Sequence, residues 1–232
     1  MTSLPEIALL SNGSYGVMIT SAGAGYSTWR GLDVTRWRED ATRDCWGQFC
    51  YVRDVGAGNL WSVGIQPLLQ PADESGFEFH ADRAEFWRRD GDVETRCAVG
   101  VAPDGDAEVR AVTLVNHGRR QLELELTSYA EVCLNDRRAD QAHPAFAKLF
   151  LETSFEPRCG ALVARRRPRG AQEQPIFAVH SSTLGGVTSE ETEYETDRLR
   201  FLGRGRTPAN PAACHVAMAQ QVELRQRSLR NM

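Results

Sequence analysis

Apolar and polar residues alternate with a period of two along much of this 232-residue chain. The alternation is clearest from Val93 to Val101, where every second residue is apolar, Thr or Cys. Successive side chains of a strand point to opposite faces of a sheet, so this period indicates half-buried strands. Similar segments follow at 109–116 and 122–132, separated by turn-forming residues. Together they predict an antiparallel meander with one face exposed to solvent.

Short strands are also predicted through most of the rest of the chain, bounded by Gly, Pro, Asn, Asp or Ser. They cover residues 15–20, 48–53, 60–63, 76–80, 84–89, 149–155, 161–165 and 176–181. Many short strands with frequent turns are typical of sandwiches rather than of alternating strands and helices. The sequence therefore predicts an all-β, mainly antiparallel fold built as a large two-sheet sandwich.

Helical patterns are predicted only near the C-terminus. Residues 196–203 suit a short helix, with Asp197 near its start and Gly203 at its end. Residues 216–229 are rich in Ala, Met, Gln, Glu and Arg, which permit a helix.

The charge balance argues against two classes of partner. The chain has 27 Lys and Arg against 31 Asp and Glu, a formal net charge of −4. Proteins that bind nucleic acid or anionic membranes usually carry a basic excess. The chain shows no basic and apolar leader and no membrane-length apolar run. Six cysteines in a chain of this size suit reduced core residues. We therefore predict a cytoplasmic location without a membrane span.

Two motifs that begin like cofactor or metal sites are incomplete. Gly23-Ala-Gly25 starts a dinucleotide fingerprint, but Thr28 replaces its third glycine and no helix pattern follows. We interpret these glycines as a tight loop. Cys45 and Cys50 have no second cysteine or histidine pair at zinc spacing. We therefore predict neither a cofactor nor a metal site.

Residues 26–46 are the strongest candidate for a binding surface. Four large aromatic rings lie within 21 residues, interleaved with arginines and carboxylates. Flat rings and the planar guanidinium fork are suited to the faces and hydroxyls of a sugar. Packing of these rings into a core is the alternative. The candidate sugar-binding or active-site-edge residues are Tyr26, Ser27, Trp29, Arg30, Arg36, Trp37, Arg38, Asp40 and Asp44.

Catalytic chemistry has weaker support in the same segment. Glycoside hydrolysis needs two carboxyl groups that flank the scissile bond. The local carboxylates are interleaved with arginines almost one for one, which favours ion pairs that hold a rigid loop. We predict no catalytic residue. One alternative is a mutarotase-like sugar enzyme that uses His80 or His143 as the acid and Glu131 as the base.

A basic run, Arg165-Arg-Arg-Pro-Arg169, is predicted to be a solvated turn. Contact with an anionic ligand is the alternative interpretation of this run.

Several motifs resemble the N-terminal domain of the inverting glycoside phosphorylases, the cellobiose phosphorylase-like glycoside hydrolase family 94. The likeness is strongest to the phosphorylase-like region of cyclic β-1,2-glucan synthases and covers about residues 9–213. The residues that carry it are Ser11–Gly13, Ser21–Arg30, Thr35–Asp44, Phe49–Asp54, Thr127–Glu131, Ala142–Phe146 and Phe201–Pro211.

The resemblance implies a galactose-mutarotase-like β-supersandwich. In that family a downstream helical barrel holds the general-acid Asp and binds phosphate as a co-substrate. The supersandwich supports the barrel, helps to form a homodimer and brings a loop to the active-site mouth. We expect the segment Tyr26–Arg38 to be that loop. The implied partners are a β-glucan oligosaccharide and the barrel domain, within a parent enzyme associated with the inner membrane.

We accordingly predict a carbohydrate-associated domain over residues 1–213. Residues 214–232 depart from the family pattern and form a polar, helix-permissive tail, so we expect the last strands of the sandwich to be missing. The preferred function is a non-catalytic carbohydrate-binding or scaffold domain of a β-glucan glycosyltransferase or glycoside phosphorylase. A purely structural dimerisation module remains an alternative.

Overall fold

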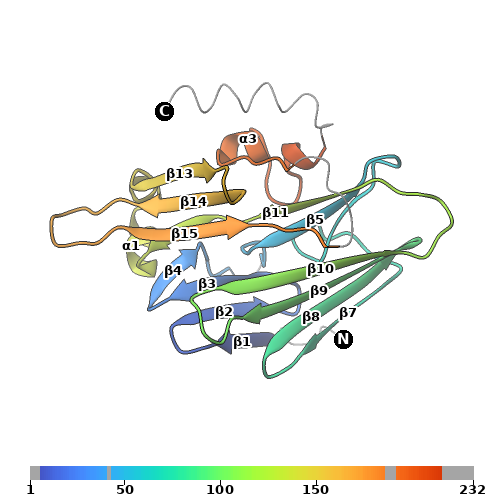
Figure 1. The fold of residues 1–232 in the computed structure, drawn as a ribbon, viewed down its shortest axis with the longest axis horizontal. Coiled ribbons are helices and arrows are strands. Elements are labelled where there is room, and N and C mark those ends of the chain that lie inside the picture. Colours follow the sequence, from blue (N-terminus) through green and yellow to red (C-terminus); the bar gives the residue numbers. More distant parts are fainter. Residues whose placement is uncertain (1–5, 41–42, 186–191, 216–232) are drawn as a thin grey trace.

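The computed structural model describes residues 6–40, 43–185 and 192–215 (Figure 1). Its strands form four antiparallel sheets. The five-stranded sheet has the order β1-β2-β3-β4-β12, from Ile7–Ser11, Tyr15–Thr20, Gly25–Trp29, Leu32–Thr35 and Val132–Asn135. The four-stranded sheet has the order β10-β9-β8-β7, from Glu108–Asn116, Val93–Val101, Arg83–Asp90 and Glu74–Phe79.

Two three-stranded sheets complete the fold. One has the order β11-β5-β6, from Leu124–Tyr129, Phe49–Asp54 and Leu60–Ser62. The other has the order β13-β14-β15, from Leu151–Glu156, Ala161–Arg166 and Ile176–Ser181. The prediction of an all-β, mainly antiparallel fold is confirmed, and the architecture is consistent with a β-supersandwich.

The main core lies between the five-stranded and four-stranded sheets. Val17 and Ile19 of β2 pack in one cluster with Phe86 of β8 and Val99 of β9. Each strand contributes alternate residues, as the period of two requires. Burial of these apolar side chains against each other stabilises the sandwich.

β5 is buried on both faces and joins two further cores. Tyr51 lies on one face, in a cluster with Phe201 and Leu202. Val52 lies on the other face, in a cluster with Trp61. The β5 strand therefore connects the sandwich to the C-terminal helical segment.

The predicted three-strand meander is wrong at its third strand. β9 and β10 pair from Glu108↔Val101 to Asn116↔Val93, as expected. β11 instead pairs with β5, beginning at Leu124↔Asp54. Leu124 packs against the cluster around Val52, so its apolar face is buried in a different sheet. Alternation identifies the buried face of a strand, but it does not identify the strand's partner.

The segment Tyr26–Arg38 is not the loop that we expected. β3 and β4 pair as a two-residue hairpin in which Trp29 lies opposite Leu32. Arg30 and Gly31 both have positive φ, 47° and 82°. This geometry matches the right-handed twist of the flanking strands. The segment is therefore a rigid hairpin followed by an extended stretch.

The helical prediction is right near the C-terminus and incomplete elsewhere. α3 covers Arg198–Leu202, and Asp197 caps it by accepting a hydrogen bond from the Leu199 amide. Residues 216–229 lie outside the described residues. Two short helices were not predicted, α1 at Arg137–Ala142 and α2 at Pro144–Lys148. Both are too short to show a helical period, although Asp136 caps α1 and Pro144 begins α2.

Candidate functional site

An aromatic–arginine platform lies on one face of the five-stranded sheet. Its members are Tyr26 of β3, Trp37 and Trp46 of the following segment, Arg38, and Arg137 of α1. The rings of Tyr26 and Trp37 are 5.6 Å apart and tilted by 55°. The Arg137 guanidinium lies 4.2 Å from the Tyr26 ring, and Arg38 lies 6.0 Å from the Trp46 ring. Tyr26, Trp37 and Trp46 are each partly exposed, and Trp37 also packs against the core cluster that contains Tyr51 and Phe201.

Ion pairs from distant segments hold the platform in place. Arg137 makes two hydrogen bonds of 2.8 and 2.9 Å to the buried carboxylate of Asp33. Arg38 donates to Trp37 O and to both the carboxylate and the carbonyl of Asp140. Such charge-assisted bonds fix the arginines, so the rings are ordered before any ligand binds.

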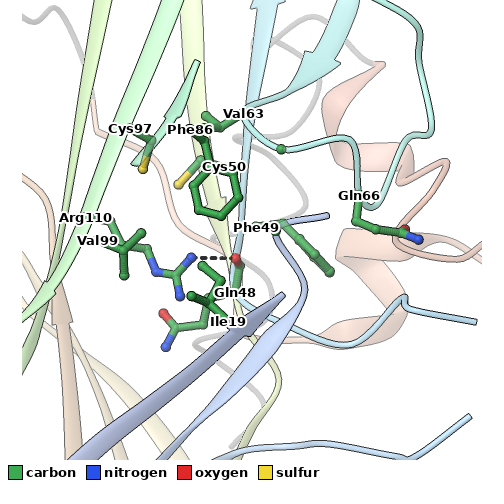
Figure 2. Close-up of a pocket in the computed structure, with 12 residues that line it drawn as sticks. Ile19, Gln48, Phe49, Cys50, Val63, Gln66, Phe86, Cys97, Val99 and Arg110 are labelled. Carbon is green, nitrogen blue, oxygen red and sulfur yellow. Dashed lines mark hydrogen bonds between the residues drawn. The ribbon is translucent and has the colours of Figure 1, made fainter. Parts of the chain in front are cut away.

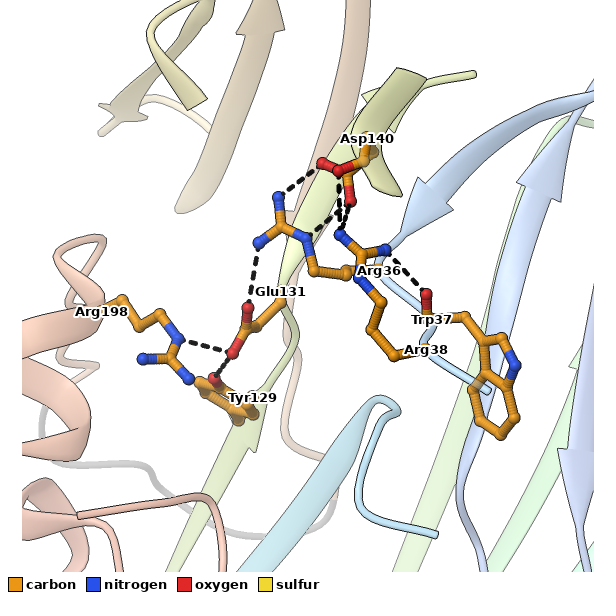
Figure 3. A network of polar contacts seen from close by, with 7 residues as sticks. All are labelled: Arg36, Trp37, Arg38, Tyr129, Glu131, Asp140 and Arg198. Atoms are coloured by element: carbon orange, nitrogen blue, oxygen red, sulfur yellow. Dashed lines mark hydrogen bonds and ion pairs between the residues drawn. The ribbon is translucent and has the colours of Figure 1, made fainter. Parts of the chain in front are cut away.

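Arg38 also belongs to a polar network centred on Asp140 (Figure 3). Arg36 Nε and Nη2 contact the Asp140 carboxylate at 2.9 and 2.8 Å. Arg36 Nη1 lies 3.2 Å from Glu131 Oε2. Figure 3 shows the two arginine forks converging on Asp140, with Glu131 linking Arg36 onward to Arg198 and Tyr129. The network ties β4, β11, α1 and α3 together.

The charges of this network are settled by its own contacts. Burial alone would raise the pKa of Asp140, but hydrogen bonds from Arg36 and Arg38 outweigh it and lower the pKa to about 2. Burial would likewise raise the pKa of Glu131, yet its contacts with Arg198 and Tyr129 lower it. Both groups are therefore ionised at neutral pH.

Three of the predicted site residues lie on the opposite face of the hairpin. Ser27 is 0% exposed and its hydroxyl donates to Glu108. Trp29 donates from Nε1 to Asp106 Oδ2 at 2.6 Å, and Arg30 stacks 5.0 Å over the Trp29 ring. Ser27 and Trp29 thus face away from Tyr26, because neighbouring residues of a strand point to opposite faces of the sheet.

The two predicted carboxylates have different surroundings. Asp40 is exposed, and its backbone carbonyl accepts from the Arg43 amide at 3.1 Å. Asp44 accepts a 2.8 Å hydrogen bond from the Thr20 hydroxyl at the end of β2. Burial raises the pKa of Asp44, and the Thr20 hydrogen bond opposes that rise.

The expected pairing with local carboxylates is wrong for Arg36 and Arg38. The arginines of the segment were expected to pair with carboxylates nearby in sequence. Arg36 and Arg38 instead pair with Asp140, about a hundred residues downstream. Arg137 and Asp140, the two residues that sequence reasoning missed, lie on the unpredicted helix α1. The sequence signal for this helix was Asp136, because Asp is a residue type that favours the start of a helix.

The acid–base pair of a mutarotase-like site is not assembled. The contacts described for Glu131 are with Arg36, Arg198 and Tyr129. His80 lies 3.8 Å from Glu78 and 3.9 Å from Glu85 in the four-stranded sheet. His143 lies between α1 and α2 and is exposed. Among the described residues, no group of three or more His, Cys, Asp or Glu is placed to hold a metal ion.

A small pocket is lined by residues from β2, β5, β8, β9 and β10 (Figure 2). Apolar side chains line it together with Cys50, Cys97, Gln66 and Arg110. Arg110 donates to Gln48 O at 2.9 Å and to Glu108 Oε1 at 2.9 Å. Both bonds are to groups of the chain itself, so the guanidinium of Arg110 is held by its own neighbours.

The antiparallel sheets form an architecture of the β-supersandwich class. A sequence profile described as "Glycosyl hydrolase 94, supersandwich domain" matches residues 1–228, and the chain belongs to this family. The match extends past residue 213. The domain boundary that we placed there stays a prediction, because residues 216–232 lie outside the described part.

Three curated relatives are each matched over 90% of this chain. Cyclic beta-(1,2)-glucan synthase NdvB of Rhizobium meliloti (strain 1021) is 40% identical over 208 residues, which is 7% of its length. The N,N'-diacetylchitobiose phosphorylases of Vibrio proteolyticus and Vibrio furnissii are 24% and 25% identical, over 26% of their length. The chain therefore spans a small part of each relative. Within the described residues, no helix combines the length and apolarity needed to cross a bilayer.

Proposed function

We propose that this domain is a non-catalytic carbohydrate-binding and scaffold module of a β-glucan glycosyltransferase or glycoside phosphorylase. The aromatic–arginine platform is the binding surface, and the ligand is a β-1,2-linked gluco-oligosaccharide. The observation that carries the proposal is the pair of partly exposed rings of Tyr26 and Trp37, 5.6 Å apart and bordered by fixed arginines.

The platform has the two kinds of group that sugar recognition needs. Ring faces offer apolar surface to the C–H face of a sugar, and guanidinium N–H groups not bonded to Asp33 or Asp140 can donate to its hydroxyls. Arg137 and Arg38 are held by Asp33 and Asp140, so little side-chain entropy is lost on binding. A rigid surface of this kind favours binding without a conformational change.

Catalysis is assigned to a separate domain. Both buried carboxylates next to the platform, Asp140 and Glu131, are saturated by arginines and are held ionised. Ionised carboxylates have no proton to donate, so they cannot serve as general acids towards a glycosidic oxygen. The platform therefore binds substrate or product for a catalytic domain, which we propose to be the helical barrel of the parent enzyme.

Isothermal titration with β-1,2-linked gluco-oligosaccharides tests the proposal. Trp37→Ala removes half of the ring pair and is expected to weaken binding at least tenfold, the usual cost of truncating a central aromatic contact. Trp87→Ala is the matched control, because Trp87 is 38% exposed on the four-stranded sheet, away from the platform. Equal affinities for both variants, or no binding by the native chain, would refute the proposal.

A structural dimerisation module is the second candidate function. The observation in its favour is that β15 leaves Phe177 and Val179 exposed on a sheet edge. Exposed edges with apolar side chains pair readily with another chain. A dimer in light scattering that becomes monomeric in Val179→Lys, together with no sugar binding, would select this function over the first.

A further inference from the structure

The basic run 165–169 differs from the solvated turn that we predicted. Arg165 and Arg166 belong to β14 and point to opposite faces of their sheet. Arg165 is exposed and lies 3.8 Å from Glu152. Arg166 is turned inward and is 8% exposed. The two neighbours have the same chemistry but entirely different surroundings.

Arg166 is a buried cation that lacks a hydrogen-bonded counter-ion among the described residues. Its Nη1 is shielded from solvent and meets no acceptor. Its described contact is with an aromatic ring, the guanidinium carbon lying 6.0 Å from the centre of Phe150. A buried donor without an acceptor is destabilising, and a buried charge without a partner more so. The position is therefore strained unless an acceptor from outside the chain completes it.

A second cation lies against the same ring. The Arg169 guanidinium is 4.9 Å from Phe150 and 5.5 Å from Phe146. Burial lowers the pKa of Arg166 and the positive charge of Arg169 lowers it further, while the charges of Glu173 and Asp140 oppose this fall. Two like charges around one ring repel each other, so the pair favours an anion that neutralises both.

The neighbouring carboxylates, Glu173 and Asp140, act on Arg166 through their charge but make their hydrogen bonds to other groups. Glu173 accepts the backbone amide of Arg169 at 2.8 Å. The Asp140 carboxylate is occupied by the forks of Arg36 and Arg38. Asn135, at the end of β12, has a second buried donor without an acceptor in its Nδ2. β12 packs against β14, so the same part of the molecule holds two unsatisfied donors.

We propose that Arg166 and Arg169 bind a phosphate-type dianion where the end of β14 meets the α2–β13 connection. Two guanidiniums match two negative charges, whereas one fork would be enough for a single carboxylate. The site uses none of the platform residues, and the proposal does not depend on sugar binding.

Thermal unfolding of the full chain in phosphate tests this site. Inorganic phosphate and sodium acetate are compared at equal ionic strength, with chloride as the reference. A ligand that binds only the folded state raises Tm, and about 5 °C is expected once phosphate is well above its Kd. Acetate is expected to have no effect beyond that of chloride. An equal response to acetate would overturn the assignment of a dianion.

Arg166→Gln and Arg165→Gln form the matched pair of variants. Arg166→Gln is expected to lose the phosphate response, and Arg165→Gln to keep it in full. The response of each variant is measured against its own Tm in chloride, so a change in basal stability does not affect the comparison. An unchanged phosphate response in Arg166→Gln, or none in the native chain, would overturn the proposal.

Discussion

Arg36 and Asp140 form a bidentate ion pair with two contacts of 2.9 and 2.8 Å across 104 residues of sequence. Asp140 is 1% exposed and Arg36 is also buried. The pair connects the end of β4 to α1, so it fixes the segment that continues to Trp37 (Figure 3). A buried pair of this kind costs desolvation to form and is costly to break from one side.

Asp140→Asn is therefore expected to destabilise the fold strongly. The amide keeps the shape of the side chain but leaves Arg36 and Arg38 without their counter-charge. Removing one partner of a buried pair typically costs about 3–5 kcal/mol. Urea unfolding at neutral pH measures the loss. A change below about 1 kcal/mol would show that solvent, rather than Asp140, balances these arginines.

Acid should weaken the same contact. The folded pKa of Asp140, about 2, lies below the ordinary value of 3.8. A carboxyl whose pKa is lowered by folding stabilises the folded state at pH values above its ordinary pKa. That stabilisation is lost as the pH falls through the pKa of the folded state. Its loss between pH 4 and pH 2 amounts to roughly 2 kcal/mol. The free energy of unfolding, measured in urea across this pH range, is expected to fall more steeply for the native chain than for Asp140→Asn. Parallel falls in the two proteins would contradict the assignment.

Cysteine reactivity should differ sharply among the six thiols. Cys159 is exposed in the turn between β13 and β14, whereas Cys97, Cys133 and Cys214 are buried. Burial raises the pKa of these three thiols to about 12. A thiol-specific reagent at pH 8 is expected to modify Cys159 in the native protein and the buried three only after unfolding. Unchanged native labelling in Cys159→Ser would contradict this assignment.

Sequence patterns predict the strands well and their neighbours poorly. The predicted ranges match β2, β9 and β15 closely, because apolar or β-branched residues bounded by turn residues mark each strand locally. β1, β3 and β4 were not predicted. The partner of β11 was missed because its apolar face suits either neighbouring sheet.

The candidate site was predicted in part for a related reason. Tyr26, Trp37 and Arg38 form one surface because of the hairpin and the stretch that follows it. Asp140, which anchors Arg38, lies about a hundred residues away on a helix too short to show a period. Long-range ion pairs leave no local signal, so the sequence indicated the rings but not their support.

Gly25 should be the least replaceable glycine of the hairpin. A Cβ there would lie 2.0 Å from the Met18 carbonyl oxygen in the paired strand β2. Backbone cannot yield as a flexible side chain can, so Gly25→Ala is expected to cost about 3 kcal/mol in urea unfolding. Gly31→Ala is the matched control, because a Cβ at that turn meets nothing within 4 Å. Its positive φ of 82° predicts a cost of only about 1 kcal/mol. A smaller loss of unfolding free energy in Gly25→Ala than in Gly31→Ala would contradict the close approach of β2 and β3. The support that these strands give to the platform would then be looser than the structure shows.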